Sequence, residues 1–434
     1  MSRLGRLSVV VLLALPAPAA RAGVPTPDPV LAVVGDIACS PADVDYNGGL
    51  GTASACRMLA TSNLAVARQS SLAGVLLLGD NQYETGDLAS YQTSFGPTWG
   101  RLGSLIHPTI GNHEYGTPGA AGYFTYFGAA AGDPAKGYYS FDVGTGPGTW
   151  HVVVLNSNCT AIGGCDAASP QVAWLRADLA SHPTDCTLAA WHHPRYSSGP
   201  HGNDPTVSTL WDVLMEQGAD LVLVGHDHLY ERFAPQDSDS RRDVVRGMRQ
   251  ILVGTGGRSL YGVASARPNV EALDATTFGA LFLTLKATGY DWSFESIDGG
   301  PPRDQGFGAC HRRPQGFYPI APCRVLDTRV LAQGPALAAG QERLVQLAGA
   351  CGVPNDATAV ASNWTTTGAS ASGELRVFPT GGDNPGNVVV AVRAGRTRAG
   401  FATLALGAGG ALQALPDLSA GSTHLVVDVT GYFR

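Results

Sequence analysis

Short apolar runs recur through the first 300 residues and predict buried strands. The runs are four or five residues long, are often β-branched, and end at Gly, Asn or His, as strands covered on both faces do. The expected strands are residues 30–34, 74–78, 151–155, 187–191, 221–224 and 250–253.

Amphipathic stretches between these runs predict helices. Ser169 and Pro170 are typical of an N-cap and a first helical position. A second helix is expected over residues 206–216, with Gly218 placed to end it. Strands that alternate with helices indicate an α/β sandwich, in which the chemistry gathers beyond the carboxyl ends of the strands.

The pattern changes near residue 299. A Gly-Gly-Pro-Pro sequence opens a polar stretch that predicts a linker at 299–316, after a domain at 23–298. From residue 317 to residue 434, short alternating segments are separated by Gly-rich turns and predict an all-β sandwich domain. Its expected strands include residues 374–378, 387–392, 401–406 and 424–429.

The first 22 residues are typical of a signal peptide, with two early arginines, an apolar run at 9–15 and the ending Ala20-Arg21-Ala22. This run is shorter than the roughly 20 residues that cross a bilayer, and no other stretch approaches that length. Removal of the segment takes away three arginines and lowers the formal net charge from −7 to −10. We therefore expect a secreted or cell-surface protein, without a transmembrane segment or a nucleic-acid partner.

Eight cysteines in an exported chain favour disulfide bonds, and none has the Cys-x-x-Cys spacing of a zinc site. Many pairings are open to eight cysteines. Proximity along the sequence favours Cys39 with Cys56, Cys159 with Cys165 and Cys323 with Cys351, which leaves Cys186 and Cys310 for each other.

Five short motifs stand in order where apolar runs end: Gly-Asp, Gly-Asp-x-x-Tyr, Gly-Asn-His-Glu, His-His-Pro and Gly-His-x-His. They supply carboxylate, amide, phenol and imidazole groups, which suit iron, zinc or manganese. Two such metals can activate water and neutralise a phosphoryl group. The motifs therefore predict a two-metal hydrolytic site built from Asp36, Asp80, Tyr83, Asn112, His113, His192, His226 and His228.

Asp80 is the expected bridge between the metals, because it heads a turn at a strand end and has two oxygens free to face different cations. Asp36 would bind one ion and Asn112 the other. His226 and His228 are two residues apart, so they can diverge to different metals where the backbone between them is not extended.

Over residues 30–297 the motifs resemble the metallophosphoesterase superfamily, and more narrowly the purple acid phosphatases. The histidine of the usual Asp-x-His motif is absent after Asp36, where Ala38 also replaces a usual glycine. Tyr83 stands where purple acid phosphatases place the phenolate that binds ferric iron. The resemblance implies a four-layer αββα calcineurin-like sandwich. The C-terminal part resembles a β domain that recurs in exported bacterial proteins.

The resemblance also implies two sets of metal ligands. Metal 1, ferric iron, would be bound by Asp36, Asp80, Tyr83 and His228. Metal 2, which would be zinc, iron or manganese, would be bound by Asp80, Asn112, His192 and His226. By the same resemblance, the residues that contact the substrate phosphate or protonate the leaving oxygen are Asn112, His113 and His201. His193 is expected to face away from the site.

The predicted activity is hydrolysis of small phosphate monoesters by attack of a metal-bound hydroxide, in the manner of an acid phosphatase. The loops at 159–165 and 200–204 are expected to frame the pocket. A phosphodiesterase on the same fold remains an alternative. A further alternative is a surface- or matrix-binding protein that makes its contacts through the C-terminal domain and retains only vestigial phosphatase activity.

Overall fold

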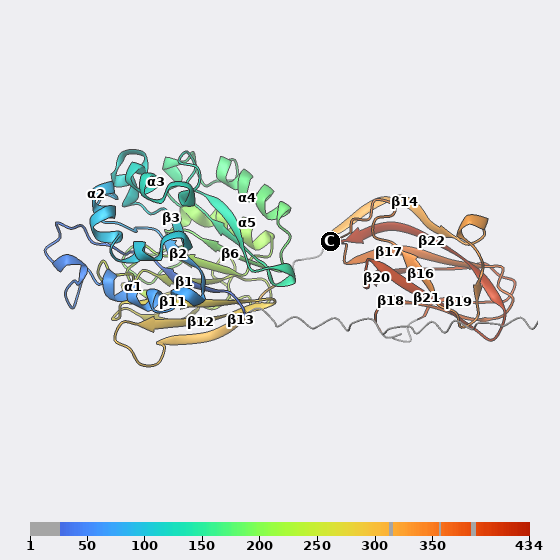
Figure 1. Ribbon diagram of the computed structural model, residues 1–434. Coiled ribbons are helices and arrows are strands. Elements are labelled where there is room, and N and C mark those ends of the chain that lie inside the picture. Colours follow the sequence, from blue (N-terminus) through green and yellow to red (C-terminus); the bar gives the residue numbers. More distant parts are fainter. Residues whose placement is uncertain (1–26, 312–315, 356, 383–387) are drawn as a thin grey trace, which may run out of the picture. The chain divides into compact units, whose positions relative to one another are not determined.

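The computed structural model describes residues 27–311, 316–355, 357–382 and 388–434. The chain divides into two compact units, Met1–Arg312 and Arg313–Arg434 (Figure 1). The predicted signal peptide lies outside the described residues. In the part of the chain that the structure describes, no helix has both the length and the apolar character needed to span a bilayer.

Two mixed β-sheets form the centre of the first unit (Figure 1). The first sheet has the strand order β13-β12-β11-β1-β2-β3, and the second has the order β10-β8-β9-β7-β6-β5-β4. The strands of the first sheet are β1 (Val30–Val34), β2 (Leu72–Leu78), β3 (Ile106–Thr109), β11 (Gly279–Lys286), β12 (Gly289–Ser296) and β13 (Asp304–Ala309). Those of the second are β4 (Tyr139–Val143), β5 (Trp150–Val154), β6 (Cys186–Ala190), β7 (Leu221–Val224), β8 (Tyr230–Phe233), β9 (Arg249–Val253) and β10 (Val270–Asp274).

The central strands are apolar throughout because each faces a core on both sides. In β1, Leu31 and Val33 pack between the two sheets. Ala32 and Val34 belong instead to the core on the outer face of the first sheet. This double burial explains why continuous apolar runs located these strands in the sequence.

Helices cover the outer faces of both sheets and complete the predicted αββα layers (Figure 1). The side chain of Ser169 accepts a hydrogen bond from the backbone N–H of Val172, so Ser169 is the N-cap of α4, as predicted. The helices are α1 (Met58–Val66), α2 (Leu88–Ser90), α3 (Ala121–Phe127), α4 (Pro170–Ser181) and α5 (Ser208–Glu216).

The segment expected to be a linker, residues 299–316, contains a strand of the first sheet. Strand β13 pairs antiparallel with β12 along its whole length. Its glycines pack against aromatic rings, because a Cβ added at Gly306 or Gly308 would come within 2.4 Å of the rings of Trp292 or Tyr290. These glycines therefore allow close packing of β13 against β12, although the composition of the segment resembles that of a flexible linker.

The second unit is a sandwich of two antiparallel sheets, with the strand orders β14-β22-β17-β20 and β16-β21-β18-β19. Strand β15 pairs with β22. Trp364 is fully buried in the core between the sheets. The strands are β14 (Phe317–Asp327), β15 (Leu337–Ala338), β16 (Arg343–Gln346), β17 (Ala359–Thr367), β18 (Gly373–Pro379), β19 (Val388–Val392), β20 (Arg398–Ala405), β21 (Ala411–Leu418) and β22 (Ser422–Phe433).

All eight cysteines form disulfide bonds, three in the pairs that proximity along the sequence favours and the fourth between the two cysteines left over, as predicted. Three bonds lie in the first unit and one in the second. The bonds are Cys39–Cys56, Cys159–Cys165, Cys186–Cys310 and Cys323–Cys351.

Candidate metal centre

The motif residues meet at the carboxyl ends of parallel strands from both sheets. Backbone and side-chain contacts join the two sheets at this edge. The N–H of Gly35 donates to the carbonyl of Val253 at 2.8 Å, and the N–H of His226 donates to Asp36 Oδ2 at 2.8 Å. The residues that follow strand ends here are Asp36 after β1, Asp80 after β2, Asn112 after β3, His192 after β6 and His226 after β7.

One half of the cluster is centred on the hydroxyl of Tyr83. Its oxygen lies 3.0 Å from Asp36 Oδ1, 3.1 Å from Asp80 Oδ2 and 3.0 Å from His228 Nε2. All four side chains are buried. These are the four residues predicted to bind metal 1.

The other half is centred on Nε2 of His192. This atom lies 3.2 Å from Asp80 Oδ2, 3.1 Å from Asn112 Oδ1 and 3.2 Å from His226 Nδ1. These are the residues predicted to bind metal 2. Asp80 Oδ2 is therefore within 3.2 Å of the central atom of each half, and Asp80 is the residue shared by the two predicted ligand sets.

The outer nitrogens of two histidines have hydrogen-bond partners that direct their inner nitrogens toward the cluster. His192 Nδ1 lies 2.8 Å from the carbonyl of Leu78, which can only accept, so this nitrogen carries the proton. In the neutral ring that binds a metal, Nε2 of His192 then carries the lone pair. His228 Nδ1 lies 3.1 Å from Ser259 Oγ, which leaves its Nε2 facing Tyr83. Such outer contacts are typical of metal-binding histidines.

The backbone adopts left-handed conformations at three of the motif residues. The φ angles are 60° at Asp36, 47° at Asp80 and 77° at His226. Such angles cost free energy at residues other than glycine and cluster at functional sites. Hydrogen bonds hold two of these turns, from Ile37 N to the carbonyl of Asp80 and from Gly225 N to the carbonyl of His192.

Charge and burial shift the proton affinities within the cluster. Burial favours the neutral form of Asp80, but attraction to His192 and His113 outweighs it and holds the pKa of Asp80 well below its usual range. Burial opposes the charged form of His192 as well, yet Asp80 raises its pKa to about 9. Burial, reinforced by Asp36 and Asp80, raises the pKa of Tyr83 well above its usual value. The proton on the Tyr83 oxygen would therefore leave only for a strongly Lewis-acidic cation.

Glu114, the last residue of the Gly-Asn-His-Glu motif, organises the turns that present the ligands. Its buried carboxylate accepts hydrogen bonds from the backbone N–H groups of Asp80, Asn81, Gln82 and Gly111 and from the hydroxyl of Tyr91. Burial and the charge of Asp80 raise the pKa of Glu114 to about 7, against the effect of these donors. Glu114 is the one residue of the Gly-Asn-His-Glu motif, apart from the glycine, for which the sequence predicted no role.

The two histidines predicted to contact substrate lie beside different halves of the cluster. The ring centroid of His113 is 4.3 Å from that of Tyr83, and its Nδ1 is 2.7 Å from the carbonyl of Glu84. The ring centroid of His201 is 4.3 Å from that of His226. His201 is exposed and His113 is partly exposed, so both can meet a ligand that enters from solvent.

The donor set fits the predicted pair of metals. Oxygen donors predominate around Tyr83, as a hard ferric ion prefers, whereas two imidazoles face Asp80 and Asn112 in the other half, as zinc, iron or manganese accepts. Ligand atoms of Asp80, His192 and His226 all lie within 4.8 Å of one another.

The fold and this cluster define the class of the first unit, and comparisons with known proteins agree. Residues 31–230 match the family model of the calcineurin-like phosphoesterases. The first unit therefore contains a calcineurin-like metallophosphoesterase domain. Its relatives are purple acid phosphatases: Purple acid phosphatase 18 of Arabidopsis thaliana is 30% identical over 195 residues, which are 40% of this chain and 42% of that protein. The chain spans about half the length of the curated relatives it matches.

Solved structures share the fold at lower sequence identity. Purple acid phosphatase PPD1 from yellow lupin (Lupinus luteus) seeds has a TM-score of 0.55 and 18% identity, over 65% of this chain and 54% of its own. GAP50, described as the anchor in the inner membrane complex of Plasmodium, has a TM-score of 0.50 and 14% identity, over 67% of this chain and 91% of its own. At these identities the likeness concerns the fold alone.

Proposed function

We propose that the protein is a secreted phosphatase with two metal ions that hydrolyses phosphate monoesters in the manner of purple acid phosphatases. The supporting observation is the convergence on Asp80. Its Oδ2 lies 3.1 Å from the Tyr83 hydroxyl and 3.2 Å from His192 Nε2, so the two halves of the cluster share one carboxylate oxygen. The homology to purple acid phosphatases supports the same activity.

Asp36, Asp80, Tyr83 and His228 would hold ferric iron, and Asp80, Asn112, His192 and His226 would hold zinc, iron or manganese. When bound, such a pair of metals supplies Lewis acidity toward the phosphoryl oxygens and lowers the pKa of water. The protein fixes the ligands in advance, through the backbone turns at strand ends and through the hydrogen bonds on the outer nitrogens of His192 and His228.

In this proposal, Asn112 and His113 hold the phosphoryl group and His201 donates a proton to the departing oxygen. The backbone N–H of His113 donates to Asp80 Oδ1 at 2.9 Å, which ties this residue to the bridging carboxylate. The backbone N–H of His201 donates to Asp227 Oδ1 at 3.1 Å, which fixes the start of its loop. His201 remains exposed, as a group that meets a leaving alcohol must be.

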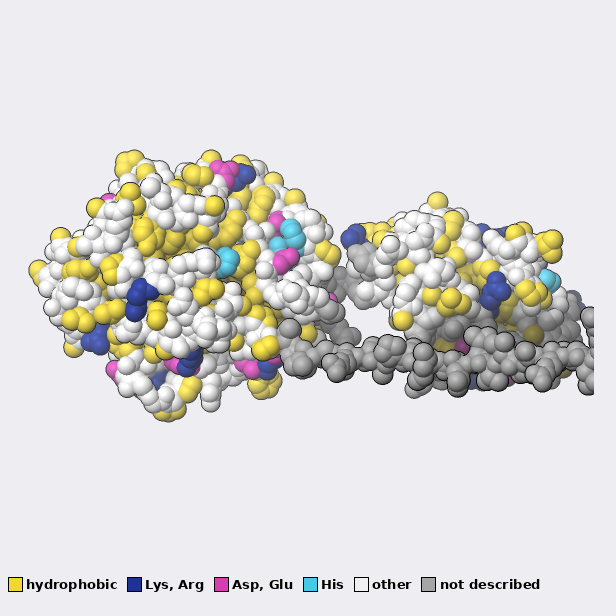
Figure 2. Space-filling model, in the orientation of Figure 1, with side chains coloured by type: hydrophobic (Ala, Val, Ile, Leu, Met, Phe, Trp, Pro, Cys, Tyr) yellow, Lys and Arg dark blue, Asp and Glu magenta, His cyan; other side chains and the backbone are white. Residues whose placement is uncertain are grey.

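The disulfide bonds and the surface charge agree with the extracellular location and the small substrate that we propose. Four disulfide bonds are typical of exported proteins. On the face that Figure 2 shows, arginine and lysine side chains lie scattered rather than gathered in a band.

The ratio of hydrolysis rates for nitrophenyl phosphate and bis(nitrophenyl) phosphate at acidic pH tests the proposed activity. We expect metal-loaded protein spanning residues 23–434 to hydrolyse the monoester faster than the diester. A ratio below one would assign the protein to the phosphodiesterases. Absence of turnover with either ester would refute the proposed activity and favour the binding-protein alternative.

We expect the iron-loaded protein to be pink or purple, because a phenolate bound to ferric iron absorbs visible light by charge transfer. Tyr83→Phe should abolish this absorption band. Tyr261→Phe is the matched control, since the ring of Tyr261 stacks on His228 at a centroid distance of 3.9 Å but its hydroxyl is not among the proposed ligands. A colourless wild-type protein, or a Tyr83→Phe variant that keeps the band, would exclude the iron–tyrosinate site.

A further inference from the structure

The second histidine of the His-His-Pro motif lies beside the proposed metal centre. The ring centroid of His193 is 4.5 Å from that of His226 and 5.0 Å from that of His192. Its side chain is partly exposed. His193 was expected to face away from the site, but its ring lies against those of two proposed metal ligands.

Ser157 determines the orientation of the His193 ring. The hydroxyl oxygen of Ser157 accepts a hydrogen bond from the backbone N–H of His193 at 3.0 Å and lies 2.8 Å from Nδ1 of the same residue. Among the described residues, Ser157 Oγ has no acceptor other than this nitrogen. Because the hydroxyl proton has no other acceptor there, we assign the Ser157 hydroxyl as the donor to Nδ1, which puts the ring proton of a neutral His193 on Nε2.

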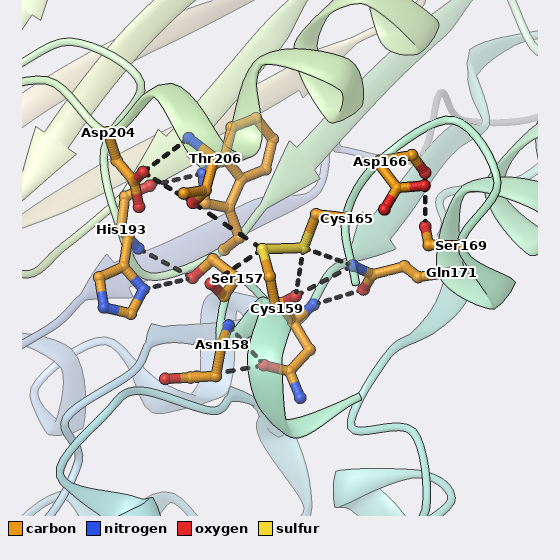
Figure 3. The surroundings of a disulfide bond; sticks show 12 residues. Ser157, Asn158, Cys159, Cys165, Asp166, Ser169, Gln171, His193, Asp204 and Thr206 are labelled. Atoms are coloured by element: carbon orange, nitrogen blue, oxygen red, sulfur yellow. Dashed lines mark hydrogen bonds between the residues drawn. A yellow bond between two sulfur atoms is a disulfide. The ribbon is translucent and has the colours of Figure 1, made fainter. Parts of the chain in front are cut away.

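The segment that carries Ser157 is fixed by its neighbours. Cys159, which is bonded to Cys165, has its sulfur 3.4 Å from the carbonyl of Ser157. The side-chain amide of Gln171 bonds both the N–H and the carbonyl of Asn156, at 2.7 Å and 2.9 Å. Figure 3 shows Ser157 between this disulfide and His193, whose ring lies on the side away from the disulfide. The orientation of His193 is therefore set by a cross-linked segment.

Nε2 of His193 is free to bind a ligand. Within the described residues, this atom has no hydrogen-bond partner, and it is not among the enclosed side-chain atoms that lack one. The ring that carries this N–H donor lies beside the imidazoles of His192 and His226, next to the region where the proposed function places the phosphoryl group. Preorganised donors at such a position favour an oxyanion without costly rearrangement.

We propose that His193 is a substrate-binding residue whose Nε2–H donates to a phosphoryl oxygen, and that Ser157 is its positioning residue. The ligand would be the phosphoryl group of the ester or the inorganic phosphate released from it. This inference rests on the proposed function for the location of the phosphoryl group. The hydrogen bonds between Ser157 and His193, and the unpartnered Nε2 among the described residues, do not depend on the proposed function.

The test compares variants of the metal-loaded protein by kcat/KM for nitrophenyl phosphate and by the dissociation constant for inorganic phosphate from calorimetry. His193→Ala should lower kcat/KM about 10²-fold, within the range for a lost oxyanion donor, and should weaken phosphate binding. His193→Gln, which keeps an N–H donor, should recover part of both losses. Ser157→Ala should lower kcat/KM about tenfold in the wild-type background. In the His193→Ala background it should have almost no effect, because the two residues act as one unit.

Ser169→Ala is the matched control. Ser169 is also a buried serine near the Cys159–Cys165 disulfide, but its hydroxyl caps α4 and makes no contact with His193 among the described residues (Figure 3). It should lower the melting temperature while kcat/KM and phosphate affinity stay at their wild-type values. Metal content is measured in every variant, and variants are compared at equal occupancy.

Unchanged kcat/KM and phosphate affinity in His193→Ala, with a lower melting temperature, would overturn the proposal and leave His193 a structural residue. Failure of the proposed function would look different, because the wild-type protein itself would then hydrolyse no ester. In that case the calorimetric comparison of wild type and His193→Ala still decides whether this residue binds phosphate.

Discussion

Asp80→Ala should lose both metals and reduce phosphate-ester hydrolysis by more than about 10³-fold, the upper end of what one electrostatic contact contributes. Among the residues that the structure describes, Asp80 is the one whose side chain lies within 3.2 Å of the central atoms of both halves, the Tyr83 hydroxyl and His192 Nε2. Alanine at this position would also leave the backbone N–H of His113 without the carboxylate oxygen that it now contacts at 2.9 Å.

Metal analysis after dialysis, together with kcat for nitrophenyl phosphate, measures the effect of Asp80→Ala. Asp133→Ala is a suitable control, because this aspartate is exposed and makes local surface contacts, an ion pair with Lys136 at 3.3 Å and a hydrogen bond from the N–H of Ala135 at 3.0 Å. It should keep two metals and wild-type turnover. Two bound metals in Asp80→Ala, or more than a tenth of the wild-type rate, would contradict the bridging role.

The largest loss of stability is expected for Glu114→Ala. This substitution removes the acceptor for four backbone N–H groups and for the hydroxyl of Tyr91. A buried donor left without a partner costs about 1–3 kcal/mol. Several such donors together would remove much of the roughly 5–15 kcal/mol by which a domain is stable. We therefore expect Glu114→Ala to unfold at a much lower denaturant concentration, or to fail to accumulate in folded form.

Glu114→Gln provides the comparison, because glutamine keeps one of the two acceptor oxygens at nearly the same volume. Its unfolding midpoint should lie between those of the wild type and Glu114→Ala. Tryptophan fluorescence in a urea titration follows the transition, since Trp99, Trp150 and Trp191 are fully buried in the first unit. Equal midpoints for all three proteins would show that the carboxylate does not hold the ligand turns together.

The sequence predicted the parts of the fold in which local pattern and tertiary environment agree. Strands β1 and β7 match their predicted limits because both faces of each strand are buried, so every position is apolar. Ser169 and Pro170 marked the start of α4 because an N-cap is a local interaction. The disulfide pairing followed from proximity for three bonds and by elimination for the fourth.

Other features of the fold and the site depend on contacts between segments that are distant in sequence, and the residue pattern of one segment does not reveal such contacts. Strand β13 has a linker-like composition because its glycines make room for Trp292 and Tyr290 of the neighbouring strand. The motifs indicated which residues would gather at the site. They gave no indication that Ser157, 36 residues away in sequence, orients His193. For the same reason, the structural role of Glu114 became visible only with the fold.

The bond between Cys186 and Cys310 closes a covalent ring with a sequence separation of 124 residues. The ring contains five histidines of the proposed site, His192, His193, His201, His226 and His228. In the chain-entropy description, closing a ring of this size restricts the unfolded chain by about 5 kcal/mol. Formation of this disulfide and metal binding both stabilise the native state. Each therefore favours the other: the disulfide raises the apparent metal affinity, and bound metal favours the oxidised pair. To the extent that a reduced chain is unfolded, it would need more free metal for equal occupancy, so formation of this bond and metal binding would reinforce each other during maturation.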